Sequence, residues 1–411
     1  MNNLTDTEGI LNNLGAIAVF KNIFNDNIIS KFLLFLDSIN QNPEISETVE
    51  NYADFISELY ESEFMGDWSS YIRNFVLTDE NVVSINCAKN NADKIPDYIM
   101  GAFEYELRIL SDVASVSFED VREILNIKYP SNSVLINSLP VFDSYKLLFT
   151  KDQIQSSYKQ EGYGVISKYY TFKFDGNLNV VPVKNPDNVK FSDLKLYEYQ
   201  KEILKTNTIS FIKGNPSNNI LLYGDRGCGK SSSIKALVNE YHHMGLKVIQ
   251  AYKNNLDKLE KLEEYLSGFP SKFIIFIDDL VFDENDPEFA SAKAILEGSL
   301  SKHPDNVLIY ATTNRRHLVK ETFSSREGNE VHLNDTMDEA ASLSDRFGIT
   351  ITFSSPDKNK YLEIVKQLKD EMNIKADEET LFKEAEAFAI LKGTRCPRVA
   401  RQFLYDFASK Q

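Results

Sequence analysis

The chain has 411 residues, of which 42% are hydrophobic and 26% are charged, a balance typical of soluble globular proteins. This length favours two or three domains, because a single hydrophobic core rarely grows beyond about 250–300 residues. The net charge of −16 opposes binding to phosphate backbones, and we interpret it as a solvated acidic face.

The sequence lacks the usual marks of membrane and secreted proteins. No run of eighteen apolar residues occurs, and no basic stretch precedes an apolar one at the N-terminus. The three cysteines, Cys87, Cys228 and Cys396, share no short spacing, which favours reduced thiols over disulfides. The five histidines have no cysteines at the spacing of a zinc site. We therefore expect a cytoplasmic protein that does not associate with membranes.

Residues 1–190 predict a mostly α-helical N-terminal domain. Apolar residues recur at helical spacing along most of this region. Towards its end, residues 163–183 combine alternating apolar residues with Asp175-Gly176, which predicts a β-hairpin. Residues 184–192, rich in Asn, Asp and Pro, are expected to form a linker. No motif in this domain carries recognisable chemistry.

Buried strands alternate with helices over residues 191–355, which predicts an α/β domain with a parallel sheet covered on both faces. After Pro356 the pattern is helical, so residues 356–411 are expected to form a small lid. The expected strands are 219–223, 246–251, 273–277, 307–312 and 349–353, with helices at 230–241, 256–266 and 289–300.

The loop after the first of these strands fits the pattern G-x-x-x-x-G-K-[ST] in full. Glycines allow sharp turns and close approach of backbone N–H groups to phosphate oxygens, and the following helix directs its positive end at them. Lys230 is expected to reach the β- and γ-phosphates, and Ser231 to hold Mg²⁺. The candidate nucleotide-binding residues of the loop are Gly224, Asp225, Arg226, Gly227, Cys228, Gly229, Lys230, Ser231 and Ser232.

The strand at 273–277 ends in two carboxylates, Asp278 and Asp279, at the sheet edge where ligands of such folds bind. We expect Asp278 to bind Mg²⁺ through water or together with Ser231. Asp279 is expected to polarise an attacking water. A cap on the following segment is the alternative role for Asp279.

The fourth strand ends in Thr312-Thr313-Asn314. A polar side chain here could orient the attacking water against the γ-phosphate. Asn314 is the first choice for this role and Thr313 the second, although strand-end Asn and Thr also make turns.

Two arginines are candidates for contacts with the transferred phosphate. Arg346 precedes the fifth strand, where it could project towards a neighbouring subunit's nucleotide, with a helix-end ion pair as the alternative. Arg398, at the start of a lid helix, could fold back onto the γ-phosphate, and Arg395 and Arg401 compete for that role. The run Arg315-Arg316-His317 could contact phosphate, protein or DNA.

Cys228 lies inside the phosphate loop, where its side chain need not touch nucleotide. A helix N-terminus can lower a thiol's pKa, so inhibition by oxidation is conceivable. A tolerated small residue is the preferred interpretation.

These elements, in this order, resemble the AAA-plus superfamily of ATPases. Residues 194–405 look like the bacterial ATPases grouped as domain-of-unknown-function family 815. The resemblance implies a five-stranded core, a helical lid and ATP as the ligand. It also implies that the ending Asp278-Asp279 is shared within this group, although many AAA-plus relatives carry glutamate at the position of Asp279, and this favours a site competent for hydrolysis. Cys228 departs from the Thr or Ser that is usual in this loop. The segments that carry the resemblance are 197–200, 218–227, 277–280, 310–318 and 398–403.

The leading hypothesis is a Mg²⁺-dependent AAA-plus ATPase that forms a homo-oligomer through its nucleotide interfaces and remodels a protein client held by the N-terminal domain. An ATP-gated interaction switch with little turnover is one alternative. A DNA-transaction factor such as a loader is another, disfavoured by the acidic charge. The expected catalytic residues are Lys230, Asp278, Asp279, Asn314 and Arg346, with Ser231 and Asp278 as metal ligands.

Overall fold

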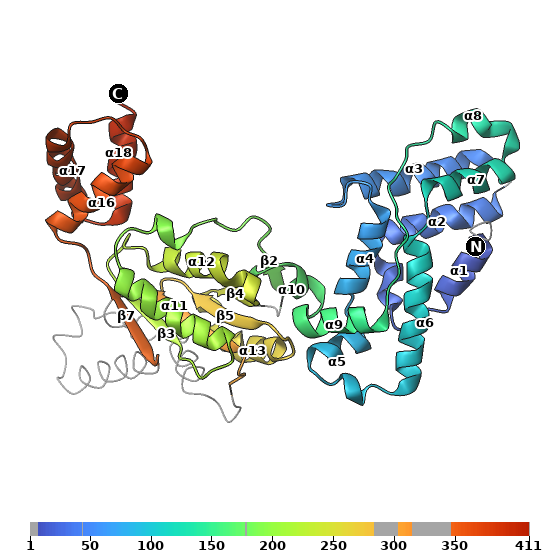
Figure 1. Ribbon diagram of the computed structural model, residues 1–411, viewed down its shortest axis with the longest axis horizontal. Helices are drawn as coiled ribbons and strands as arrows, with labels where there is room; N and C mark the ends of the chain where they lie inside the picture. The colour runs from blue at the N-terminus through green and yellow to red at the C-terminus, as the bar shows by residue number, and fades with distance from the viewer. Residues whose placement is uncertain (1–6, 43, 177–178, 283–302, 315–346, 411) are drawn as a thin grey trace. The chain divides into compact units, whose positions relative to one another are not determined.

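The computed structural model describes residues 7–42, 44–176, 179–282, 303–314 and 347–410. The chain forms two compact units (Figure 1). The N-terminal unit contains residues 1–168 together with 268–270, and the C-terminal unit contains 169–267 together with 271–411. The expected helix at 289–300 lies outside the described residues.

The described part of the N-terminal unit is helical, as the sequence predicts. Its core is aromatic: the ring of Trp68 lies 4.7 Å from that of Phe32 and 5.2 Å from that of Phe55, between ring centroids. The helices are α1 (Thr7–Gly15), α2 (Asn27–Gln41), α3 (Ile45–Glu61), α4 (Trp68–Thr78), α5 (Val82–Ala88), α6 (Asp97–Ala114), α7 (Phe118–Lys128), α8 (Ser133–Ile136), α9 (Lys151–Glu161) and α10 (Gly164–Lys168).

A buried carboxylate on α6 holds the segment that follows α1. Glu106 is only 2% exposed. Its two oxygens accept hydrogen bonds of 2.9–3.1 Å from the backbone N–H groups of Ala18, Val19 and Phe20. Because these donors are not paired within a helix or strand, Glu106 compensates for their removal from water.

The C-terminal unit is built on one sheet of seven described strands, in the order β2-β1-β4-β5-β6-β3-β7. All neighbouring pairs are parallel except β1 with β2. The parallel α/β class is confirmed, with two strands more than the five expected. The strands are β1 (Thr171–Phe174), β2 (Val180–Pro182), β3 (Ile220–Gly224), β4 (Leu246–Ala251), β5 (Lys272–Ile277), β6 (Val307–Thr313) and β7 (Ile349–Phe353).

The extra strands are the expected hairpin, placed differently from the prediction. β1 pairs with β2 but also, in parallel, with β4 of the main sheet. Phe172 and Phe174 are fully buried there, which an isolated two-stranded hairpin could not achieve. The hairpin therefore belongs to the C-terminal unit, and the boundary lies between Lys168 and Tyr169 rather than near residue 190.

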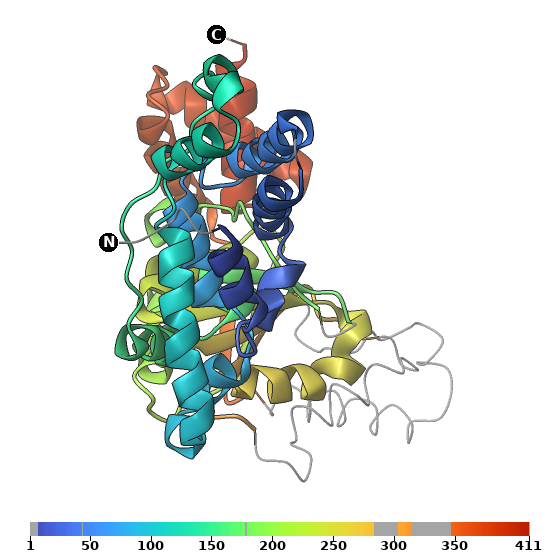
Figure 2. The same ribbon diagram turned by 90° about the vertical axis from the view of Figure 1, so that its right-hand side faces the viewer.

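Helices cover the sheet and form the lid. Residues of α11 and α12 share one buried core with β3, β4, β5 and β6. The C-terminal helices follow β7, as expected, and belong to the same unit (Figures 1 and 2). None of the helices in the described ranges has the length and apolar character needed to cross a membrane. The helices are α11 (Glu198–Ile212), α12 (Lys230–Tyr241), α13 (Leu259–Ser267), α16 (Lys358–Glu371), α17 (Glu378–Lys392) and α18 (Pro397–Ala408).

The role of Glu106 can be measured with a matched pair of variants on the same helix. We expect Glu106→Ala to lower the free energy of unfolding by about 3 kcal/mol, because it leaves buried N–H groups unpaired. Glu104→Ala, which removes a half-exposed partner of Arg108, should change it by less than about 1 kcal/mol. Trp68 is the chain's single tryptophan, so its emission during denaturant titration reports on the N-terminal unit. Equal effects of the two variants would contradict this role.

Candidate nucleotide-binding site

The phosphate loop runs from the end of β3 to the start of α12, at the carboxyl edge of the sheet. Gly224 and Gly229 have positive φ angles of 138° and 94°, which side chains disfavour. A Cβ atom on Gly224 would lie 2.1 Å from the carbonyl oxygen of Phe353 in β7. The N–H of Asp225 donates to that oxygen at 2.9 Å. The loop therefore begins where β3 and β7 lie in register.

Lys230 is the first residue of α12, and its side chain returns into the loop. The ammonium donates to the carbonyl oxygens of Gly224 and Asp225, at 2.7 and 2.9 Å, and to Oδ1 of Asn314 at 2.9 Å. Burial lowers the pKa of Lys230 below its usual value, against the opposing effect of nearby acidic groups. In this arrangement the carbonyl groups of the loop bind the ammonium group of Lys230.

Asp278 and Ser231 meet directly, although they come from different elements. The Ser231 hydroxyl donates to Oδ1 of Asp278 at 2.6 Å. Thr312, on the neighbouring strand β6, donates to the same oxygen at 2.6 Å and accepts from the N–H of Asp279 at 2.9 Å. The result is a fixed pair of hard oxygen ligands, one carboxylate and one hydroxyl, of the type that Mg²⁺ prefers.

Asp279 and Asn314 also lie together at this edge. The side-chain amide of Asn314 donates to Oδ1 of Asp279 at 2.6 Å while its oxygen accepts from Lys230. Asp279 has a φ of 52°, a left-handed conformation that aspartate tolerates better than most residues. A continuous chain of hydrogen bonds therefore joins Lys230, Asn314 and Asp279.

The lid approaches the loop at the start of α18. A Cβ atom on Gly227 would lie 2.7 Å from Sγ of Cys396 and 3.2 Å from Cβ of Arg398. Arg398 lines the cavity above the loop, as does Arg401. Arg395 instead forms an ion pair with Glu386, donating from Nε at 3.1 and 3.2 Å. Of the three lid arginines, Arg395 is therefore already engaged within the lid.

These groups enclose a cavity of about 660 Å³, within the range of small-molecule sites. Its lining includes the phosphate loop and the strand-end residues, together with Asp193, Leu194, Lys195 and Tyr197 and lid residues such as Leu368 and Tyr405. The lining therefore combines cations and backbone N–H donors with apolar side chains.

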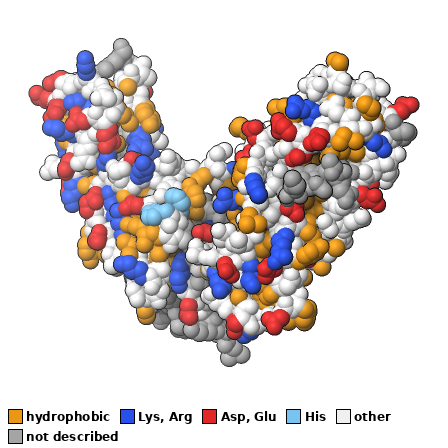
Figure 3. All heavy atoms as spheres, turned by 45° about the vertical axis from the view of Figure 1, so that its right-hand side comes forward, with side chains coloured by type: hydrophobic (Ala, Val, Ile, Leu, Met, Phe, Trp, Pro, Cys, Tyr) orange, Lys and Arg blue, Asp and Glu red, His pale blue; other side chains and the backbone are white. Residues whose placement is uncertain are grey.

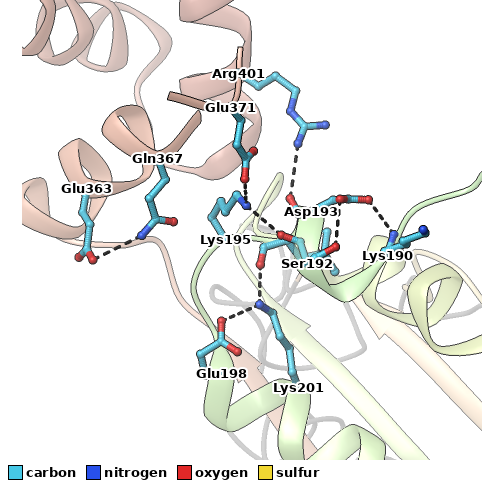
Figure 4. A network of polar contacts seen from close by, with 11 residues as sticks. Lys190, Ser192, Asp193, Lys195, Glu198, Lys201, Glu363, Gln367, Glu371 and Arg401 are labelled. Carbon is cyan, nitrogen blue, oxygen red and sulfur yellow. Dashed lines mark hydrogen bonds and ion pairs between the residues drawn. The ribbon is translucent and has the colours of Figure 1, made fainter. Parts of the chain in front are cut away.

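The segment at residues 190–201 contributes Asp193, Lys195 and Tyr197 to this cavity, which sequence reasoning missed: residues 197–200 carried the family resemblance, but no binding role was expected there. Figure 4 shows how it joins the lid: Lys195 forms an ion pair with Glu371 of α16, and Arg401 of α18 donates to the carbonyl oxygen of Asp193 at 3.5 Å. Leu196 and Tyr197 both have positive φ angles, 66° and 67°. Such strained backbone persists only where surrounding contacts hold it, and it is common at ligand sites.

The remaining sequence candidates are placed as follows. Thr313 is fully buried and does not line the cavity, whereas Thr312, which was not proposed, contacts both aspartates. Cys228 is buried, and burial raises the pKa of its thiol. This opposes the lowered thiol pKa that a helix N-terminus could have produced. Arg346 and the run 315–317 lie outside the described residues. Within the described ranges, no cluster of three His, Cys, Asp or Glu residues offers a further metal site.

A family model described as "Protein of unknown function (DUF815)" matches residues 167–411, more than half of the chain. The chain belongs to this family. The resemblance expected from the sequence is thereby confirmed, and the DUF815 match begins close to the boundary between the two units. A comparison with curated proteins finds no match.

Solved structures that resemble this DUF815 chain include RuvB of Thermotoga maritima. Two single-residue variants of it match with 14% and 13% sequence identity and a TM-score of 0.33, covering 53% of this chain and 71% of theirs. A structure titled as the RuvB Holliday junction branch migration motor matches with 14% identity, a TM-score of 0.31 and the same coverage. Because these identities and TM-scores are low, the roles of residues in this DUF815 protein are assigned from its own sequence and structure.

The lowered pKa of Lys230 predicts an unusual pH dependence of nucleotide binding. Phosphate oxygens favour the charged ammonium, so affinity should fall as pH rises through the depressed pKa of Lys230, below the pH at which an exposed lysine titrates. Lys230→Arg should bind more weakly but without this decline, because arginine stays charged. Titrations with a fluorescent ATP analogue across alkaline pH measure both. A decline of the same size in both proteins would assign it to another group.

Two glycines with nearly equal φ angles test the contact between lid and loop. In Gly227→Ala, the added methyl collides with Cys396 and should displace the lid, weakening nucleotide affinity by about tenfold. In Gly214→Ala, with a φ of +79° but no atom within 4 Å, only backbone strain of about 1 kcal/mol should appear. Calorimetric titration with nucleotide, with the unfolding transition as a second measurement, separates the two effects. Unchanged affinity in Gly227→Ala would argue against the contact.

Proposed function

We propose that this protein is a Mg²⁺-dependent ATPase of the AAA-plus type. The observation that carries the proposal is the meeting of Ser231 and Asp278 at 2.6 Å, in the same cavity as Lys230 and the phosphate loop. A hydroxyl and a carboxylate held this close form a ligand pair for Mg²⁺, and glycines beside them expose backbone donors for phosphate oxygens. Ser231 and Asp278 would hold Mg²⁺, which would offset the negative charge of the phosphates.

Lys230 supplies the charge for the β- and γ-phosphates. Its ammonium already lies among loop carbonyls, so it needs only to exchange those acceptors for phosphate oxygens. Arg398, a lid residue that lines the cavity, is proposed to approach the terminal phosphate. Arg346 is proposed to act on the nucleotide of a neighbouring subunit, with a homo-oligomer formed through these interfaces.

Asp279 and Asn314 are proposed to position the attacking water. Both side chains line the cavity at the strand ends, and Asn314 fixes one oxygen of Asp279. The second carboxylate oxygen of Asp279 then accepts a proton from water directed at the γ-phosphate. Closure of the lid around nucleotide would be transmitted to the N-terminal unit, which binds a protein client.

Substitutions within the site test hydrolysis directly. We expect Lys230→Ala to abolish Mg²⁺-dependent phosphate release, because the phosphates lose their buried cation. Lys235→Ala removes a half-exposed lysine of the same helix that pairs with Asp187, and it should leave the rate unchanged. Asp279→Asn should bind ATP with little change but lose about 100-fold in single-turnover rate, since an amide cannot accept the proton. Phosphate release that survives in Lys230→Ala would refute the proposal.

An ATP-gated switch with little turnover is the second candidate, favoured by the state of Asp279. Aspartate is shorter than glutamate by one methylene, and one of its oxygens is already bonded to Asn314. Tight ATP binding with nucleotide-dependent assembly, but without single-turnover hydrolysis, would identify the switch.

A further inference from the structure

The segment that joins α8 to α9 in the N-terminal unit is an extended chain, not a helix, over residues 140–149. Its alternate residues form hydrogen bonds on one side only. The N–H groups of Asp143, Tyr145, Leu147 and Phe149 donate, at 2.8–3.0 Å, to the carbonyl oxygen of Gly66 and to the hydroxyls of Ser69, Ser115 and Ser111 respectively. Three serine side chains therefore take the place of a neighbouring strand.

The carbonyl groups of the odd-numbered residues point to the same side of the segment as their N–H groups. The carbonyl oxygen of Val141 accepts from the Tyr60 hydroxyl, and that of Asp143 accepts from the N–H of Trp68 at 2.9 Å. The carbonyl oxygen of Tyr145 accepts from the Ser69 hydroxyl at 3.0 Å. From Val141 to Phe149, the backbone hydrogen bonds of the segment thus belong to the odd-numbered residues; before it, the carbonyl oxygen of Pro140 accepts from the Tyr52 hydroxyl at 2.6 Å.

The even-numbered residues present the opposite edge. In β geometry the N–H and C=O of one residue point to the same side, and the next residue points to the other. Within the described residues, no hydrogen bond involves the backbone groups of Ser144, Lys146 or Leu148. Leu148 is 68% exposed, and Figures 1 and 2 both show the segment running along the surface beside α4 and α6. This is an open strand edge, which can pair with another extended chain.

Charge selects the kind of chain that fits this edge. Residues 1–168 carry 25 Asp and Glu side chains against 12 Lys and Arg, which places −13 of the total charge of −16 on the N-terminal unit. Figure 3 shows the acidic side chains of the visible face spread among apolar ones. A second copy would bring two such acidic units together, which like-charge repulsion disfavours. A basic chain is attracted instead.

We propose that the outward edge of residues 142–148 binds an extended, basic segment of a protein client by strand addition. Backbone pairing with Ser144, Lys146 and Leu148 supplies the affinity, and the acidic surface of the unit supplies attraction over a distance. The proposal rests on the proposed function, in which the N-terminal unit holds the client.

Lys146 allows the backbone contact to be removed without changing the inward bonds. Lys146→Pro deletes an outward N–H, a position at which an edge strand tolerates proline. Lys146→Ala keeps the N–H and removes only the side chain. The probe is a peptide of alternating Lys and Val, about six residues long, and its control has Glu in place of Lys. Affinities are measured by calorimetry on the full-length protein.

We expect the Lys-Val peptide to bind the unaltered protein and Lys146→Ala similarly, and Lys146→Pro at least about tenfold more weakly. The Glu-Val peptide should not bind. In amide hydrogen exchange, the bound peptide should protect Ser144, Lys146 and Leu148, with Asp143, Tyr145 and Leu147 unchanged. The emission of Trp68 and basal phosphate release should be unchanged in Lys146→Pro, which excludes misfolding.

Equal binding by Lys146→Pro and Lys146→Ala would overturn the proposal, because the attraction would then be charge alone. Self-association that is lost in Lys146→Pro would overturn it in favour of a second copy. Failure here with normal ATP hydrolysis refutes only the client surface. Absence of hydrolysis in the unaltered protein refutes the proposed function whatever the peptide does.

Discussion

The parallel pairing of β3 with β6 on one side and β7 on the other, continued by β5 beyond β6, brings together the strand-end residues of the candidate nucleotide site. Because parallel strands end at the same edge, the phosphate loop after β3, the aspartates after β5 and Asn314 after β6 all meet there. The register matters at the level of single residues. Gly224 lies opposite Phe353, and only a residue without a side chain fits against its carbonyl oxygen.

Much of this arrangement could be predicted because it follows from local patterns. Apolar runs of strand length, a glycine-rich loop and carboxylates at strand ends are visible in the sequence and are linked by the topology they imply. The contribution of Thr312 to the site could also have been predicted. Thr312 and Asn314 are two positions apart and therefore lie on the same side of β6, whereas Thr313 points the other way into the core. The strand period favours Thr312 over Thr313.

Other features depend on contacts between distant residues and leave no local signal. The sequence of β1 and β2 predicts a hairpin, but β1 joins the main sheet by pairing with β4, which lies more than seventy residues later in the chain. The segment at 190–201 begins within the expected linker at 184–192, and nothing local in the sequence indicates its contacts with the lid. Its two left-handed residues are Leu196 and Tyr197. The Tyr197 hydroxyl donates to the carbonyl oxygen of Ser354, and the neighbouring Lys195 forms an ion pair with Glu371. Neither partner can be identified without the fold.

The chain of hydrogen bonds through Asn314 gives the proposed function a physical route by which nucleotide binding and hydrolysis would be coupled. In the present arrangement Lys230 and Asp279, a cation and an anion, are both bonded to the same amide. Under the proposed function, a phosphate group that draws Lys230 away would leave the Asn314 oxygen without its donor, while the amide N–H of Asn314 still bonds to Asp279. That bond would continue to hold the strained backbone of Asp279 in place. One side chain would thus link the phosphate to the carboxylate whose second oxygen is proposed to accept the proton.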